Sequence, residues 1–210
     1  MDFLAALITQ YPDLSACAAD IRRALDLLRA CYRAGGKVLV CGNGGSAADS
    51  EHIVGELMKG YRLKRPVPPA SRAKLMAAFP AEGVYLADHL QGALPAVSLV
   101  SQTALLTAFA NDVAPDMIFA QQVYGYGVEG DALIAISTSG NSANVLRAAQ
   151  TARALGLHTI GLTGHSGGAL KAVCEVTICA PAEGAAAVQE RHLPIYHALC
   201  AALEAEFFDS

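Results

Sequence analysis

Five short apolar runs rich in β-branched residues alternate along this chain with segments of helical periodicity. This alternation is typical of a parallel β-sheet, because parallel neighbours need a crossover connection and the crossover is usually a helix. We therefore predict an α/β fold in which a five-stranded parallel sheet is flanked by helices on both faces. The predicted strands are residues 37–42, 95–100, 132–137, 158–163 and 175–181.

The segments between these strands carry helix signals. In IRRALDLLRACYRAGG the apolar residues recur at helical spacing, and the paired glycines 35 and 36 end the helix just before the first strand. With 210 residues, the chain is long enough to bury a core and short enough to be one domain. The predicted helices are residues 2–10, 14–34, 46–60, 102–109, 116–125, 142–155 and 189–207.

One connection departs from this rhythm. Residues 62–95 hold five of the nine prolines and are far longer than an ordinary connection between elements. We interpret about 67–93 as an insertion. Two interpretations stay open: a surface excursion that packs on the domain or on a neighbouring subunit, and a lid over a site.

Charge and hydropathy exclude several classes of protein. The formal net charge is −4 and no basic block is longer than RLKR, which argues against a nucleic-acid partner bound through bulk charge. No stretch approaches the roughly 20 uninterrupted apolar residues that span a bilayer, so no membrane partner is expected. The opening MDFLAALITQ lacks the features of a secretory signal, which predicts a cytoplasmic protein. Six cysteines without a CxxC pair are then expected to be free thiols: Cys17, Cys31, Cys41, Cys174, Cys179 and Cys200.

Glycine- and hydroxyl-rich turns follow three of the predicted strands. In parallel sheets, ligands bind beyond the carboxyl ends of the strands, where the N–H groups at helix starts attract anions. The first turn contains Asn43, Gly44, Gly45 and Ser46, and Ser46 is expected either to cap the following helix or to donate to a phosphate oxygen. The second turn contains Ser137, Thr138, Ser139 and Ser142 around Gly140. The third, GLTGHSGGAL, is similar but looser. Such turns suit a phosphate and sugar hydroxyls, although each alone also fits an ordinary turn.

Nucleotide ligands fit the sequence poorly. GNGGSA matches the GxGxxA pattern of dinucleotide-binding turns, yet no acidic residue follows at the end of a second strand about 20 residues on. The GK[ST] of a triphosphate-binding loop is absent as well. We therefore expect no nucleotide cofactor.

Titratable groups follow the first turn and recur near the end of the chain. His52 and Glu56 are four positions apart, so they share one face of a helix and can act on one ligand or one metal ion. In VQERHLPIYHAL, Gln189, His192 and His197 lie on one side of the last predicted helix. For His192 both a hydrogen-bonded core position and a functional one stay open.

Taken together, these segments resemble the sugar isomerase (SIS) domain family, and most of all its phosphoheptose isomerases. The resemblance covers most of the chain outside 67–93 and rests on CGNGGSAADSEHIVGEL, FANDV, GDALIAISTSGNSANV, LTGHSGGAL and VQERHLPIYHAL, in this order. It implies one SIS domain over residues 1–210, a homotetramer with sites at subunit interfaces, and isomerisation of sedoheptulose 7-phosphate. The short phosphoheptose isomerases lack the 67–93 stretch, which leaves the identity of the sugar phosphate open.

Site residues follow from the same resemblance. It implies that Glu56 and His197 are the acid–base pair, which suits a ketose–aldose exchange because protons must move on both carbon and oxygen. The implied sugar-phosphate contacts are Asn43, Gly44, Gly45, Asn111, Asp112, Ser137, Thr138, Ser139, Ser142 and Gln189.

Some members of the family bind Zn²⁺ through the positions of His52, Glu56, Gln189 and His197. For this chain the metal stays an open alternative, because a carboxylate held by zinc is a poorer base and because eight helical residues from Gln189 to His197 span about 12 Å. A non-catalytic binding protein of the same family, either a partner of a replication initiator or a sugar-phosphate sensor, is the alternative function. The presence of both Glu56 and His197 favours the enzyme.

Overall fold

The computed structural model of the chain describes residues 2–208 and contains one five-stranded sheet. The strand order is β2-β1-β3-β4-β5, and every neighbouring pair is parallel. The order places β1 and β3 side by side at the centre, and both are fully buried. The predicted α/β sheet is confirmed, and each strand lies inside its predicted range: β1 (Val38–Cys41), β2 (Ala96–Ser98), β3 (Ala132–Ile136), β4 (His158–Thr163) and β5 (Val176–Cys179).

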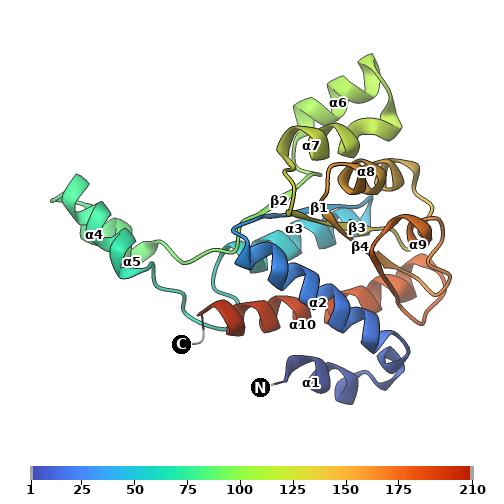
Figure 1. The fold of residues 1–210 in the computed structure, drawn as a ribbon, viewed down its shortest axis with the longest axis horizontal. Helices are drawn as coiled ribbons and strands as arrows, with labels where there is room; N and C mark the ends of the chain where they lie inside the picture. The colour runs from blue at the N-terminus through green and yellow to red at the C-terminus, as the bar shows by residue number, and fades with distance from the viewer. Residues whose placement is uncertain (1, 209–210) are drawn as a thin grey trace.

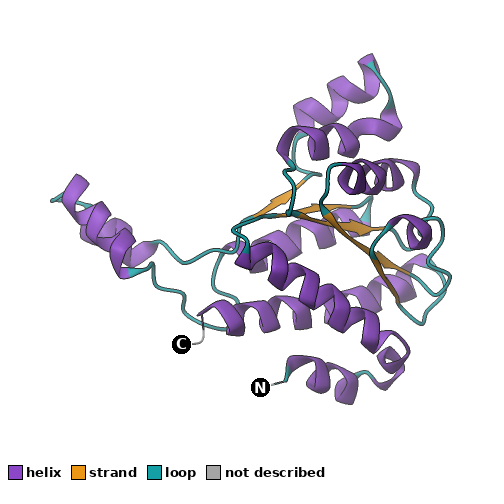
Figure 2. Ribbon diagram, in the orientation of Figure 1, coloured by secondary structure: helices purple, strands orange, loops and turns teal. Residues whose placement is uncertain are grey.

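Helices cover both faces of this sheet, as Figures 1 and 2 show. The side chains of the first layer pack with alternate strand residues such as Val38 and Val40 into one core, and those of the second layer pack with Leu39 and Cys41 into another. The first layer consists of α2 (Ala18–Arg33), α3 (Gly45–Met58) and α10 (Ala185–Phe208), with α1 (Phe3–Gln10) packed outside α10. The second consists of α7 (Ile118–Tyr126), α8 (Ala143–Ala154) and α9 (Leu170–Val173), with α6 (Thr103–Asp112) against α7.

Several helix boundaries differ from those predicted. The predicted helix at 14–34 divides into a 3₁₀ segment, η1 (Pro12–Cys17), and α2, and a second 3₁₀ turn, η2 (Pro115–Met117), precedes α7. Proline stands at the start of both 3₁₀ segments, where its fixed φ and missing N–H are tolerated. The last helix begins four residues earlier than predicted and continues through Pro194.

The insertion forms a helical hairpin that extends away from the body of the molecule (Figure 1). Its helices, α4 (Pro69–Ala78) and α5 (Gly83–His89), pack against each other, and α4 has no buried residue. At the base, Pro66 and Gln91 form an antiparallel bridge, and the Gly92 N–H donates to the carbonyl of Arg65 at 2.7 Å. The two ends of the hairpin are therefore held side by side.

None of the helices within residues 2–208 is long and apolar enough to cross a membrane. All six cysteines are free, as predicted, and four of them are buried: Cys17, Cys31, Cys41 and Cys200.

Candidate active site

The first glycine-rich turn joins β1 to α3. Gly44 has a φ of 57°, in the left-handed region that favours glycine, and it occupies the N-cap of α3. The expectation that Ser46 caps this helix is therefore wrong, because Ser46 is the second residue of α3 and is buried. The side-chain amide of Asn43 pairs reciprocally with that of Asn144, with both N–H···O distances at 2.9 Å. Since Asn144 lies in the first turn of α8, this pair ties the first turn to the serine-rich one.

The serine-rich turn joins β3 to α8. The Oγ atoms of Ser137 and Ser142 are 3.0 Å apart, and Thr138 and Ser139 line a cavity of about 300 Å³ together with His165 from the third turn. Gly140, with a φ of 68°, lies so close to the third turn that a Cβ atom there would be 2.1 Å from the carbonyl oxygen of Gly167. Backbone packing therefore fixes the shape of this turn.

Gln189, near the start of α10, lies against the first turn. A Cβ atom added to Gly45 would come within 2.5 Å of the Gln189 Nε2, so the bare glycine is what leaves room for the amide. The structure thus brings the predicted binding residues of the first turn, the serine-rich turn and α10 to one edge of the sheet.

Asn111 and Asp112 are the two predicted site residues that stand apart. They end α6, are exposed, and bond to each other, with the Asn111 Nδ2 donating to the Asp112 Oδ1 at 2.8 Å. No recorded polar contact within residues 2–208 joins them to either turn or to α10.

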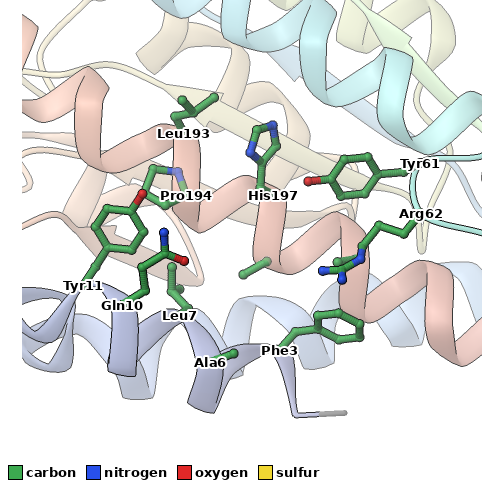
Figure 3. Close-up of a pocket in the computed structure, with 12 residues that line it drawn as sticks. Phe3, Ala6, Leu7, Gln10, Tyr11, Tyr61, Arg62, Leu193, Pro194 and His197 are labelled. Carbon is green, nitrogen blue, oxygen red and sulfur yellow. The ribbon is translucent and has the colours of Figure 1, made fainter.

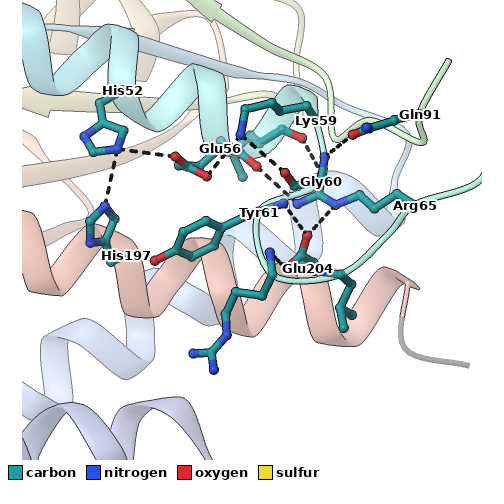
Figure 4. Close-up of polar contacts among 12 residues, drawn as sticks. His52, Glu56, Lys59, Gly60, Tyr61, Arg65, Gln91, His197 and Glu204 are labelled. Carbon is teal, nitrogen blue, oxygen red and sulfur yellow. Dashed lines mark hydrogen bonds and ion pairs between the residues drawn. The ribbon is translucent and has the colours of Figure 1, made fainter. Parts of the chain in front are cut away.

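The predicted acid–base residues meet around His52 (Figure 4). The His52 Nε2 lies 3.3 Å from the Glu56 Oε1 and 3.4 Å from the Nε2 of His197. Glu56 and His52 come from successive turns of α3, whereas His197 comes from α10, which packs beside it. The Glu56 side chain is only 13% exposed, and its second oxygen has the Lys59 ammonium at 3.7 Å.

A tyrosine and an aspartate orient the His52 ring. The His52 Nδ1 is 2.9 Å from the Tyr196 hydroxyl, which in turn donates to the Asp49 Oδ1 at 3.2 Å. The Tyr196 hydroxyl therefore bonds both Asp49 and the Nδ1 of His52, which fixes the orientation of the ring and turns its Nε2 towards Glu56 and His197. Burial, followed by the nearby Asp49, raises the pKa of Tyr196, so the hydroxyl stays protonated at neutral pH.

His197 is enclosed by three rings. Its centroid lies 5.0 Å from those of His52 and Tyr196 and 5.6 Å from that of Tyr61. Burial, and then the neighbouring His52, lower the pKa of His197 below its ordinary value, so the imidazole is neutral at pH 7. A neutral imidazole can accept one proton and donate another, as acid–base chemistry on a sugar oxygen requires.

His197 and the serine-rich turn line different cavities of the single chain. His197 lines a cavity of about 270 Å³ between α1 and α10, with Gln10, Tyr61 and Arg62 on its polar side (Figure 3). No residue of the serine-rich turn lines that cavity, and neither Glu56 nor His197 lines the cavity at the turn. The hairpin lines neither of them.

The sequence did not single out Tyr61, Tyr196 or Asp49. Tyr196 directly precedes His197, and Asp49 stands one helical turn before His52, so their spacing was the available signal. Tyr196 stands among apolar residues of α10, and a tyrosine in such a run is typical of a core position, so nothing in the sequence indicated a role at the site.

The sequence matches the SIS domain family over residues 14–80 and 71–164, and the chain belongs to this family. Within it, the chain is similar to phosphoheptose isomerases. It is 41% identical to the phosphoheptose isomerase of Rhodospirillum rubrum over 91% of this chain and 88% of that protein. The solved phosphoheptose isomerase of Neisseria gonorrhoeae superposes with a TM-score of 0.72 at 33% identity, over 95% of this chain and 94% of the other. That of Francisella tularensis superposes with a TM-score of 0.74 at 32% identity, over 91% and 88%.

Proposed function

We propose that this chain is a phosphoheptose isomerase, which interconverts sedoheptulose 7-phosphate and D-glycero-D-manno-heptose 7-phosphate. The observation that carries the proposal is that Glu56, His52 and His197 lie in contact. They do so in a chain that is similar to a phosphoheptose isomerase over 91% of its length. The same similarity favours an enzyme over a non-catalytic SIS protein.

The chemistry needs two kinds of proton transfer, and the cluster offers a group for each. In the ketose-to-aldose direction, Glu56 removes a proton from C1 while the carbonyl oxygen on C2 gains one from His197. The enediol that results loses the proton of its O1 hydroxyl to His197, and Glu56 returns its proton to C2. Protons and electrons balance over the two steps, and no external oxidant or reductant is needed. Binding of the phosphate by the serine-rich turn holds the substrate while this happens.

Replacing Glu56 by Gln tests this assignment. The amide keeps the size of the side chain but cannot take the carbon-bound proton, so turnover should fall by about 10²- to 10⁴-fold while binding of the sugar phosphate survives. Turnover is followed by NMR with a panel of five- to seven-carbon sugar phosphates, and binding by calorimetry.

Glu51→Gln provides the matched control on the same helix. Its carboxylate is exposed and accepts a hydrogen bond from the Ser101 hydroxyl at 2.8 Å. This variant should keep full activity. Wild-type turnover in Glu56→Gln would overturn the role given to Glu56, and isomerisation of only a shorter sugar would overturn the substrate.

We also propose that the acid–base cluster holds a zinc ion. The donor set fits: two imidazoles and a carboxylate meet, the Tyr196 hydroxyl turns the Nε2 of His52 towards the cluster, and the buried Oε2 of Glu56 has no hydrogen-bond partner among residues 2–208. In the described part of the chain, no group of three or more His, Cys, Asp or Glu side chains is already arranged to hold a metal ion. His52, Glu56 and His197 would be the ligands, and Gln189 lies outside the contacts of this cluster.

A zinc ion bound there would polarise the carbonyl group of the substrate. Elemental analysis of protein purified without chelator should find about one zinc per chain, and the His52→Ala variant should lose it. Metal-free protein with full activity would contradict the proposal.

We infer a homotetramer whose sites form between subunits. This is supported by the separation of His197 from the serine-rich turn, since the two line different cavities in one chain. Light scattering on the purified protein should give four times the chain mass of 21.8 kDa. The six free cysteines support a cytoplasmic location, since thiols stay reduced there.

A further inference from the structure

A buried ion pair lies directly behind the acid–base cluster, between the end of α3 and α10. The Glu204 carboxylate is 1% exposed and accepts four hydrogen bonds, three of them from the backbone N–H groups of the segment that follows α3. The fourth comes from the Nε of Arg65 at 2.8 Å. Burial opposes the charge, but these bonds outweigh it and leave the pKa of Glu204 below its ordinary value.

The other nitrogens of the Arg65 guanidinium reach the backbone of the proposed base. Nη1 donates to the carbonyl of Leu57 at 2.7 Å, and Nη2 donates to the carbonyl of Glu56 at 3.1 Å. These carbonyls belong to the last turn of α3, where no intrahelical N–H is left to bond them. The fully buried guanidinium therefore replaces the missing helix hydrogen bond at the Glu56 carbonyl, and it shares the Leu57 carbonyl with the Leu94 N–H, which donates at 3.0 Å.

The same pair holds the helix that carries the proposed acid. Glu204 follows His197 by seven positions on α10, so the two side chains lie two turns apart on the same face. Arg65 thus bridges the two helices, because its guanidinium bonds both the Glu56 carbonyl of α3 and the Glu204 carboxylate of α10 (Figure 4). It joins α3 at the carbonyl of Glu56 to α10 at a point two turns beyond His197.

We propose that Arg65 and Glu204 are positioning residues that fix Glu56 relative to His197 for proton transfer. The inference rests on the proposed function for the two groups it aligns. Neither residue lines the cavity at His197. A shift of about 1 Å in a reacting group can cost about 100-fold in rate, so a small relaxation of the bridge should reach turnover.

Away from the acid–base cluster, this chain holds another ion pair whose carboxylate is equally buried. Asp131 is 1% exposed, accepts from the backbone N–H groups of Lys37 and Val128 at 2.9 Å each, and pairs with the Lys37 ammonium at 2.5 Å. It lies at the opposite end of the central strands, next to the first residues of β1 and β3. Asp131→Asn therefore removes a buried charge of the same kind away from the site.

The test compares Glu204→Gln and Arg65→Lys with Asp131→Asn. Lysine keeps the charge of Arg65 but lacks the fork that reaches Glu204 and both carbonyls at once. For both bridge variants we expect kcat to fall about 10- to 100-fold with KM within about twofold, measured on the folded fraction. Asp131→Asn should lower the melting temperature without changing kcat. If Glu204→Gln does not fold, Arg65→Lys carries the comparison.

A second readout does not depend on turnover. In ¹H–¹⁵N spectra of the histidine side chains, with signals assigned through His52→Gln and His197→Gln, the bridge variants should shift the resonances of these two rings and Asp131→Asn should not. Wild-type kcat with unshifted rings in both bridge variants would overturn the inference. If the wild-type protein is inactive but the bridge variants still shift the resonances of both rings, the proposed function is overturned and the positioning role of Arg65 and Glu204 stands.

Discussion

At the scale of single residues, two histidines of α10 have opposite surroundings although only five positions separate them. His192 is fully buried, and its Nε2 donates to the carbonyl of Thr163 at 3.2 Å, while its Nδ1 has no partner. Of the two interpretations that the sequence left open, the core position is the one observed. Burial lowers the pKa of His192 to about 4, so a proton on this ring would be both buried and unpaired.

This burial predicts a loss of stability in mild acid. Between pH 6.5 and 4 the unfolded chain binds a proton at His192 and the folded chain does not, so the free energy of unfolding falls as the pH falls. The loss should approach about 3 kcal/mol near pH 4 and stop growing below it. In His192→Asn this contribution is absent. Urea unfolding of both proteins at pH 7 and pH 4.5 checks this, and an equal loss in both would contradict it.

Single residues also show the limits of the sequence. His52 and Glu56 could be paired from their spacing, because a helix repeats every 3.6 residues. The contact between Arg65 and Glu204 could not, because 139 positions separate the partners. Arg65 moreover belongs to the RLKR block, whose charges are typical of a solvated surface. Only the fold brings this guanidinium into the interior.

At the scale of elements, strands were easier to predict than the insertion. Each strand is largely buried because helices cover both faces of the sheet, so its residues are mostly apolar or small even over only three to six positions. The helices of the hairpin bury almost nothing: α4 has no buried residue, and α5 buries only Gly83 and Ala87. Because neither helix has a buried face, their apolar residues do not recur at helical spacing. The sequence therefore did not predict these two helices.

The isolation of the hairpin predicts that it can be removed. In a variant with a two-residue Asn-Gly turn in place of residues 68–89, the flanking segments should still meet, since Pro66 and Gln91 are already paired. The free energy of unfolding should stay within about 0.5 kcal/mol of the full chain, because the hairpin makes few contacts with the body. Isomerase KM should also be unchanged. Thermal melts and kinetics on both proteins test this, and a large loss in either would show that another surface covers the hairpin.

At the scale of the whole molecule, His197 and the serine-rich turn lie at separate cavities of one chain. The parallel sheet collects the turns at the carboxyl ends of its strands, whereas α3 and α10 carry the acid–base groups two or more turns further along. The sequence predicted both sets of residues but not their separation, since spacing along a chain does not say which cavity a side chain enters. In the homotetramer that we infer, a second subunit would bring the two together.

Shared sites predict that two inactive variants restore each other. Glu56→Gln removes the base, and Ser139→Asp places a like charge against the substrate phosphate. After refolding of an equal mixture, about a quarter of the sites should combine an intact cluster with an intact turn, and activity should return to about that fraction. Each variant refolded alone is the control. If the mixture stays as inactive as its components, each site is built from one chain.

Gly140 has a consequence for how this protein can vary over time. Its left-handed backbone and its approach to Gly167 leave no room for any side chain. Every single-nucleotide change that replaces this glycine would therefore be removed by selection as long as sugar phosphates are the substrate. Proteins descended from this one can accumulate substitutions in α4 and α5 while this turn stays unaltered. A survey of their genes should therefore find varied residues in α4 and α5 and a glycine at the position of Gly140.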